Sequence, residues 1–191
     1  MSLTQRILMR TFGRPEGLLG WLGGVILARA NRSFAHEVVA VLKVGVAENV
    51  LEVGFGPGVA IELLASAAPR GFIAGVDPSA EMVRQATARN AAAIRSGVAE
   101  LHRGTAESLP FQDEMFDTVL AINSMQVWPE IDAGLREIRR VLAAGGRVAL
   151  GFTPRSGQPR AGATETLSAA GFDQARLVEL RGGFCALARK G

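Results

Sequence analysis

The sequence predicts an α/β fold in which helices cover both faces of a doubly wound, mostly parallel sheet of seven strands. The first observation is a regular alternation of short apolar runs with helical patterns from about residue 46 onward. The second is the nearly continuous apolar run 116–123, which is typical of a parallel sheet covered on both faces. The third is a glycine-rich turn at residues 54–58, between a predicted strand and a predicted helix. A single domain is expected, because no linker or repeat interrupts the pattern.

The elements follow from the spacing of apolar residues and from the residues that end each run. Helices are expected where apolar side chains recur every three or four positions, as Ile61, Leu64 and Ala68 do. In chain order we predict helix 33–44, strand 49–53, helix 59–68, strand 72–77, helix 80–94 and strand 99–103. Pro69-Arg70-Gly71 ends the second helix, and Ser79 is a suitable N-cap for the third.

The second half of the chain continues this alternation after a loop over residues 104–114. There we predict strand 116–123, helix 130–142, strand 147–152, helix 163–170 and the closing strands 175–180 and 183–189. Helix 130–142 carries one apolar stripe, and Gly145-Gly146 follows its end. The polar loop 153–162 is short, so it leaves no room for a large inserted substrate domain.

Composition is that of an ordinary soluble globular domain, with 48% hydrophobic and 20% charged residues in a chain of 191. Cys185 is the single cysteine, so the chain can form neither an internal disulfide nor a cysteine-based metal site. His36 and His102 lie far apart in the sequence, and no metal site is expected. A reducing cytoplasm fits this cysteine usage.

Positive charge is concentrated near the N-terminus. Residues 1–45 hold six basic and two acidic side chains, or +4, so the remaining residues carry −1 of the net +3. A nucleic-acid-binding surface would need a dense basic stripe with interleaved aromatic residues, and the sequence has none. No nucleic-acid partner is therefore expected.

The N-terminal residues 1–45 are predicted to form a helical cap or lid on the main unit, residues 46–191. Arginines precede the apolar run 18–28, a pattern that also occurs in signal peptides. That run is too short to span a bilayer, and glycines interrupt it, so stable membrane insertion is not expected. Peripheral membrane contact through residues 18–28, with Trp21 among them, remains open as an alternative.

The glycine turn carries the main functional signal. Gly54, Gly56 and Gly58 alternate directly after a strand, so bare backbone can approach a ligand. The helix that follows directs its first N–H groups toward the same place. Dinucleotide folds space their glycines as G-x-G-x-x-G, which differs from this turn. A nucleotide-like ligand other than a nicotinamide is therefore expected.

With Glu52, the turn has the form E-x-G-x-G-x-G, which resembles motif I of the class I S-adenosylmethionine-dependent methyltransferases. The resemblance covers residues 46–190 and implies a Rossmann-like fold. Asp77, 23 residues after Gly54, would accept hydrogen bonds from both ribose hydroxyls, as in dinucleotide folds. The alternative is that Asp77 only caps the turn before Pro78.

Residues 104–111 are similar to the family segment G-D-A-E-x-L-P-F, whose acidic residue binds the adenine amino group. Thr105 stands at that position here, and its hydroxyl could still accept the bond. The backbone N–H of Ala106 would meet a ring nitrogen. Glu107 is either a cofactor contact or a solvated loop residue.

Further matches follow in the family's order. Residues 116–123 resemble the fourth strand, which places Asn123 beside the methionine part of the cofactor. Residues 141–147 resemble the family's L-K-P-G-G turn with Ala143-Ala144 in place of Lys-Pro, and Gly171-Phe172 matches its A-G-F element. The resemblance implies S-adenosylmethionine as cofactor, bound by Glu52, Gly54, Gly56, Gly58, Asp77, Pro78, Met82, Thr105, Ala106, Glu107 and Asn123.

The expected activity is methyl transfer to a small-molecule acceptor by direct displacement at the sulfonium methyl. Residues 124–129 should line the acceptor side, where Met125 and Trp128 form an apolar wall or only pack under the next helix. No catalytic residue is assigned: His102 is interpreted as a core histidine, and His36 as a residue that could face the pocket. Two alternatives stay open, a catalytically inactive cofactor-binding regulatory or partner protein and another nucleotide-binding enzyme such as a dehydrogenase.

Overall fold

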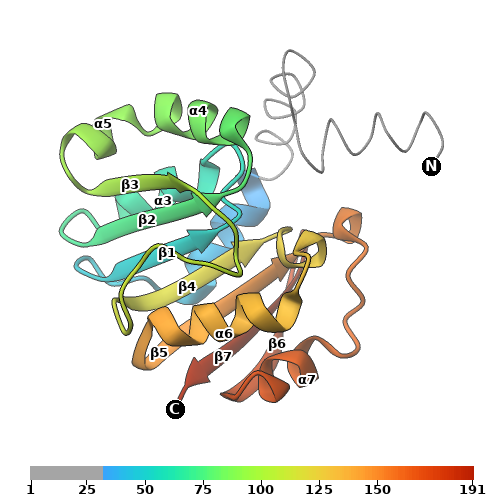
Figure 1. Ribbon diagram of the computed structural model, residues 1–191. Helices are drawn as coiled ribbons and strands as arrows, with labels where there is room; N and C mark the ends of the chain where they lie inside the picture. The colour runs from blue at the N-terminus through green and yellow to red at the C-terminus, as the bar shows by residue number, and fades with distance from the viewer. Residues whose placement is uncertain (1–31) are drawn as a thin grey trace.

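A seven-stranded sheet lies at the centre of the computed structural model, which describes residues 32–191 (Figure 1). The strand order is β3-β2-β1-β4-β5-β7-β6, and β7 is antiparallel to both of its neighbours. The strands are β1 (Asn49–Val53), β2 (Phe72–Asp77), β3 (Ala99–Arg103), β4 (Phe116–Ile122), β5 (Leu142–Phe152), β6 (Phe172–Leu180) and β7 (Gly183–Lys190). The prediction of a mostly parallel, seven-stranded α/β sheet is thus confirmed.

Helices cover the sheet on both faces. They are a helix over residues 32–42, α3 (Val59–Ala67), α4 (Ala80–Arg89), α5 (Ala91–Arg95), α6 (Ile131–Val141) and α7 (Ala163–Ala169), with short 3-10 helices η2 (Met125–Val127) and η3 (Pro154–Ser156). One core lies under α6 and α7, and the other lies under the helix over 32–42, α3 and α4 (Figure 1). Within residues 32–191 no helix is long and apolar enough to cross a bilayer. Most of the predicted cap, residues 1–31, lies outside the described residues.

Two predicted elements differ from the structure for identifiable reasons. The predicted helix 80–94 is divided at Asn90, whose side-chain amide donates to Gly58 O at 3.0 Å and to Ala86 O at 2.9 Å. Asn90 therefore acts as a C-cap that also fastens α4 to the glycine turn. The strand predicted at 147–152 begins at Leu142, because an irregularity in its pairing with β4 takes up residues 143–146. Gly145 and Gly146 lie inside that strand and not in a turn before it.

The topology brings the loops of the predicted site to one edge. Strands β3, β2, β1, β4 and β5 are parallel, so their carboxyl ends share that edge of the sheet. From β1 the chain proceeds to β2 and β3 on one side, and β4 then lies on the other side of β1. This reversal makes the boundary between β1 and β4 the switch point, where ligands bind in open α/β sheets.

Candidate functional site

The glycine turn connects the end of β1 to α3. Its glycines have positive φ angles, 77° at Gly54, 52° at Gly56 and 75° at Gly58. A Cβ on Gly54 would lie 2.1 Å from the Ser124 hydroxyl oxygen, so a side chain is excluded there. A Cβ on Gly56 would meet no described atom within 4 Å. The backbone at Gly56 is therefore the part of the turn that a ligand can approach.

Asp77, at the end of β2, holds the turn in place. Its Oδ2 accepts a hydrogen bond of 2.9 Å from Gly56 N–H, and its Oδ1 accepts one of the same length from Ser79 N–H. The residue is 6% exposed, and burial raises the pKa of its carboxyl although both N–H donors lower it. Each carboxylate oxygen has a second acceptor position. Asp77 can thus support the turn and still accept hydrogen bonds from a ligand.

Glu52 is a second carboxylate at this edge, on β1. It is 3% exposed, and its Oε2 has no hydrogen-bond partner within residues 32–191. Burial raises the pKa of Glu52 well above its ordinary value, and the charge of Asp77 raises it further, while the Ile61 N–H lowers it. A buried carboxylate oxygen without a donor is costly. The arrangement therefore suits a ligand that brings a hydrogen-bond donor or a positive charge.

The end of β4 forms the other side of the switch point. Asn123 has φ 50°, and its Oδ1 accepts hydrogen bonds from Thr153 N–H at 2.8 Å and from Thr153 Oγ1 at 3.1 Å. Ser124 belongs to the segment predicted to line the acceptor side, but its structural role was not predicted. It is buried against Gly54 and accepts a hydrogen bond of 2.8 Å from Trp128 Nε1.

Met125 and Trp128 pack under α6, which is one of the two roles that the sequence left open for them. Met125 belongs to the core cluster that also contains Leu135 of α6. A Cβ on Gly134 of α6 would lie 2.7 Å from the Trp128 ring. Val127, between them in sequence, is 61% exposed. Val127 is therefore the large apolar side chain of this segment that is exposed.

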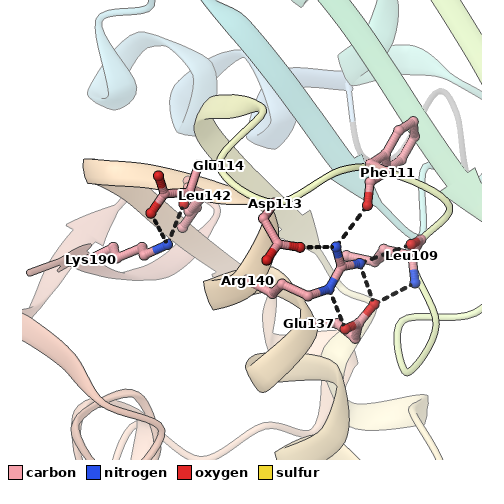
Figure 2. A network of polar contacts seen from close by, with 8 residues as sticks. All are labelled: Leu109, Phe111, Asp113, Glu114, Glu137, Arg140, Leu142 and Lys190. Atoms are coloured by element: carbon pink, nitrogen blue, oxygen red, sulfur yellow. Dashed lines mark hydrogen bonds and ion pairs between the residues drawn. The ribbon is translucent and has the colours of Figure 1, made fainter.

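The β3–β4 loop carries the predicted adenine contacts and is fastened to α6 at two places. Thr105 is exposed and Ala106 is buried in the core. Near the start of α6, Glu107 Oε1 accepts a long hydrogen bond of 3.4 Å from Glu130 N–H. Near the end of α6, Arg140 donates hydrogen bonds to backbone carbonyls of the loop and Glu137 accepts one from a backbone N–H, as Figure 2 shows. The loop is therefore positioned by the helix behind it.

Other predicted residues have mainly structural surroundings. Gly58 packs against α4, where a Cβ would lie 2.7 Å from the Ala86 side chain, and Met82 is buried in the core beneath α3 and α4. Pro78 is exposed, and its carbonyl accepts a hydrogen bond of 3.2 Å from Arg103 Nε. Their contribution to ligand binding stays a prediction.

The two histidines have different surroundings. His36 is exposed on the helix over residues 32–42. The His102 side chain is 31% exposed, with Nε2 2.7 Å from Glu100 Oε1 and its ring edge-on to Phe111. The interpretation of His102 as a satisfied core histidine is corrected, because its side chain is only partly buried and its buried Nε2 makes no hydrogen bond of good geometry within residues 32–191. Among the described residues no cluster of three or more His, Cys, Asp or Glu side chains could hold a metal.

The structure brings Glu52, Gly54, Gly56 and Asp77 together at the carboxyl edge, and Asn123 follows the adjacent strand. A family profile described as "Methyltransferase domain" matches residues 51–150, which include all of them. The chain belongs to the class I S-adenosylmethionine-dependent methyltransferases. It is a methyltransferase enzyme whose cofactor is S-adenosylmethionine.

Individual relatives agree with this family. The methyltransferase is similar to the uncharacterized methyltransferase YdaC of Bacillus subtilis, 25% identical over 88% of this chain and 98% of that protein. It is also similar to the ubiquinone/menaquinone biosynthesis C-methyltransferase UbiE of Geotalea daltonii, 30% identical over 68% of this chain and 56% of that protein. A crystal structure of a putative S-adenosyl-L-methionine-dependent methyltransferase from Methanococcus maripaludis shares the fold, with a TM-score of 0.73 and 17% identity. The match covers 98% of this chain and 91% of that chain.

Proposed function

We propose that this methyltransferase transfers the methyl group of S-adenosylmethionine to a small-molecule acceptor by direct displacement. The observation that carries the proposal is the Asp77 carboxylate at the carboxyl end of β2, held by Gly56 N–H and Ser79 N–H. Both of its oxygens retain acceptor capacity, which suits a pair of ribose hydroxyls. Gly56 beside it leaves the backbone open to the rest of the cofactor.

The other predicted site residues support the same proposal, with the ribose of the cofactor at Asp77. The unpartnered Glu52 Oε2 is suited to the methionine end, either directly or through a water molecule. Asn123 follows β4 on the same side, whereas Thr105, Ala106 and Glu107 follow β3 on the adenine side. Pro78 and Met82 complete the wall after β2. The cofactor supplies a methyl group already activated by a positively charged sulfur, so the chain has to bind, orient and exclude water.

In the proposed reaction an electron pair of the acceptor, a lone pair or the π electrons of an electron-rich carbon, forms a bond to the methyl carbon while the carbon–sulfur bond breaks toward sulfur. S-adenosylhomocysteine leaves, and any proton on the acceptor passes to solvent. No side chain is assigned as a general base, so we expect an acceptor that is nucleophilic without a histidine base. The printed name of the Geotalea relative, a quinone-biosynthesis C-methyltransferase, supports a small-molecule acceptor.

We also place this activity in the cytoplasm, with no nucleic-acid partner. A single buried cysteine is compatible with a reducing compartment. The described strands and helices carry acidic and basic side chains in mixture, without the continuous basic stripe that nucleic-acid binding needs. The predicted lid role of residues 1–45 stays part of this proposal.

Calorimetry with S-adenosylmethionine and with NAD tests the cofactor site. We expect binding of S-adenosylmethionine only, and a loss of about 10- to 100-fold in affinity for Asp77→Ala, since hydrogen bonds to a charged group are lost. Asp132→Ala, an exposed aspartate at the start of α6, is the matched control. Release of S-adenosylhomocysteine from a metabolite extract tests turnover. Preferred binding of NAD, or equal affinity of both variants, would refute the proposal.

A further inference from the structure

Gln126 has a buried side-chain oxygen that no described donor reaches. Its Nε2 donates a hydrogen bond of 2.8 Å to Asn123 O, and its Oε1 is buried without a partner within residues 32–191. A carbonyl oxygen can only accept hydrogen bonds, so the NH₂ group must face Asn123 and the oxygen must point away from it. Unpaired buried acceptors in native proteins need an explanation, and a ligand is one.

The position of Gln126 associates this oxygen with the ligand edge of the sheet. Asn123 and Ser124 directly follow β4, and Ser124 lies against Gly54 of the glycine turn. The contact with Asn123 O folds the Gln126 side chain back onto this strand end. The boundary between β1 and β4 is the switch point, where the ligand lies beyond the strand ends. The Gln126 side chain is thus held at the strand end where the ligand edge begins, and its oxygen is the end that does not contact Asn123.

The chemistry of an amide restricts what this oxygen can do. It accepts a hydrogen bond well, but it cannot take up a proton at neutral pH, so Gln126 is not a general base. The adjoining Val127 presents an exposed apolar surface. A hydrogen-bond acceptor next to an apolar surface suits a molecule that has an O–H or N–H group on an apolar body.

We propose that Gln126 Oε1 accepts a hydrogen bond from an O–H or N–H group of the methyl acceptor and thereby selects and orients it. The inference rests on the proposed transfer to a small molecule and adds the chemical class of the acceptor. The donor need not be the methylated atom, since a phenol oxygen can direct methylation of its own ring. The ammonium group of the cofactor's methionine could also donate a hydrogen bond to this oxygen. Measuring cofactor affinity and acceptor turnover separately distinguishes the two donors.

The test compares wild type with Gln126→Leu, using Gln174→Leu as the matched control on the opposite edge of the sheet. Gln174 is exposed at the irregularity near the start of β6. Cofactor binding is measured by calorimetry with S-adenosylhomocysteine. Turnover is measured as S-adenosylhomocysteine release with phenols, alcohols and amines, each beside its O- or N-alkylated counterpart that lacks the donor.

We expect Gln126→Leu to bind S-adenosylhomocysteine within about twofold of wild type and to lose about tenfold in kcat/KM for donor-bearing acceptors, the value of one hydrogen bond. Gln174→Leu should change neither quantity. A loss of S-adenosylhomocysteine affinity in Gln126→Leu would assign the oxygen to the cofactor and overturn the proposal. Unchanged kcat/KM, or a wild type that binds cofactor but converts only compounds without a donor, would overturn it too. A wild type that binds no cofactor would refute the proposed function itself.

Discussion

Arg140 provides the sharpest test of how the cofactor edge is supported. Its guanidinium group donates to Leu109 O, Phe111 O and Asp113, and makes two further hydrogen bonds to Glu137 (Figure 2). These contacts fasten the β3–β4 loop to α6. Arg140→Ala removes every one of them and leaves two loop carbonyls without their donor.

The expected loss follows from the exposure of these groups. The Arg140 side chain is 31% exposed, so water replaces part of what is lost. Two hydrogen bonds to partly buried carbonyls contribute about 1 kcal/mol each. The partly exposed carboxylate partners add about 0.5–1 kcal/mol. We therefore expect Arg140→Ala to lower the free energy of unfolding by about 3 kcal/mol, or the melting temperature by about 6–12 °C.

Urea unfolding followed by circular dichroism measures this loss. Arg136→Ala is the control, because Arg136 is exposed on the same helix, and its change should stay within about 0.5 kcal/mol. Arg140→Lys keeps the charge but loses the planar fork, so it should recover less than half of the loss. A loss below about 1 kcal/mol for Arg140→Ala, comparable to Arg136→Ala, would refute the role of Arg140 as the fastener of the loop.

The pH dependence adds an independent check on the same contact. Arg140 lowers the pKa of Glu137 below its ordinary value of 4.5, chiefly through their hydrogen bonds. A carboxyl with a lowered folded-state pKa stabilises the fold above its unfolded pKa, and this stabilisation is lost as the pH falls through the folded pKa. The difference in stability between wild type and Arg140→Ala should therefore shrink below pH 4.5. A difference that is the same at pH 7 and in acid would show that Glu137 does not contribute.

Three further outcomes follow from the site and the core. Gly54→Ala should lower the free energy of unfolding by about 2–4 kcal/mol in urea, because the new Cβ combines a positive φ with overlap on Ser124. Gly56→Ala should lower it by only about 1 kcal/mol, because its Cβ meets no described atom, but it should weaken cofactor binding. The raised folded-state pKa of Glu52 makes wild type lose stability as the pH rises above 4.5, so Glu52→Gln should be the more stable protein at pH 8. Burial raises the pKa of the Cys185 thiol to about 12, so a disulfide reagent at pH 8 should label it only after unfolding.

Much of the fold was predictable because it depends on local patterns. The strands at 49–53, 72–77 and 99–103 are short apolar runs bounded by turn residues, and their predicted bounds match the structure. The break at Asn90 was not predictable, because it depends on an amide that reaches the Gly58 carbonyl 32 residues away. The early start of β5 likewise depends on pairing with β4 and not on its own residues.

The candidate site divides in the same way. Glu52 and Asp77 were identified from their spacing around the glycine turn, and the structure places both carboxylates at one edge. Arg140 was not identified, and neither was the packing of Ser124 against Gly54, because these contacts reach other loops and no local pattern marks them. Gln126 stood within the expected acceptor segment, but only the packing around its side chain shows which oxygen lacks a donor.

The three glycines of the turn do not have one common purpose. Gly54 is required by its approach to Ser124, and Gly58 by the packing of α3 on α4, so both would be needed in this fold whatever the ligand. Of these three glycines, only Gly56 has no described atom within 4 Å of the position of a Cβ, and its N–H donates a hydrogen bond to Asp77. The alternating glycines therefore specify mainly how the strand and helix pack. The evidence for a ligand lies in Gly56 together with the two buried carboxylates, which the packing of the turn does not by itself require.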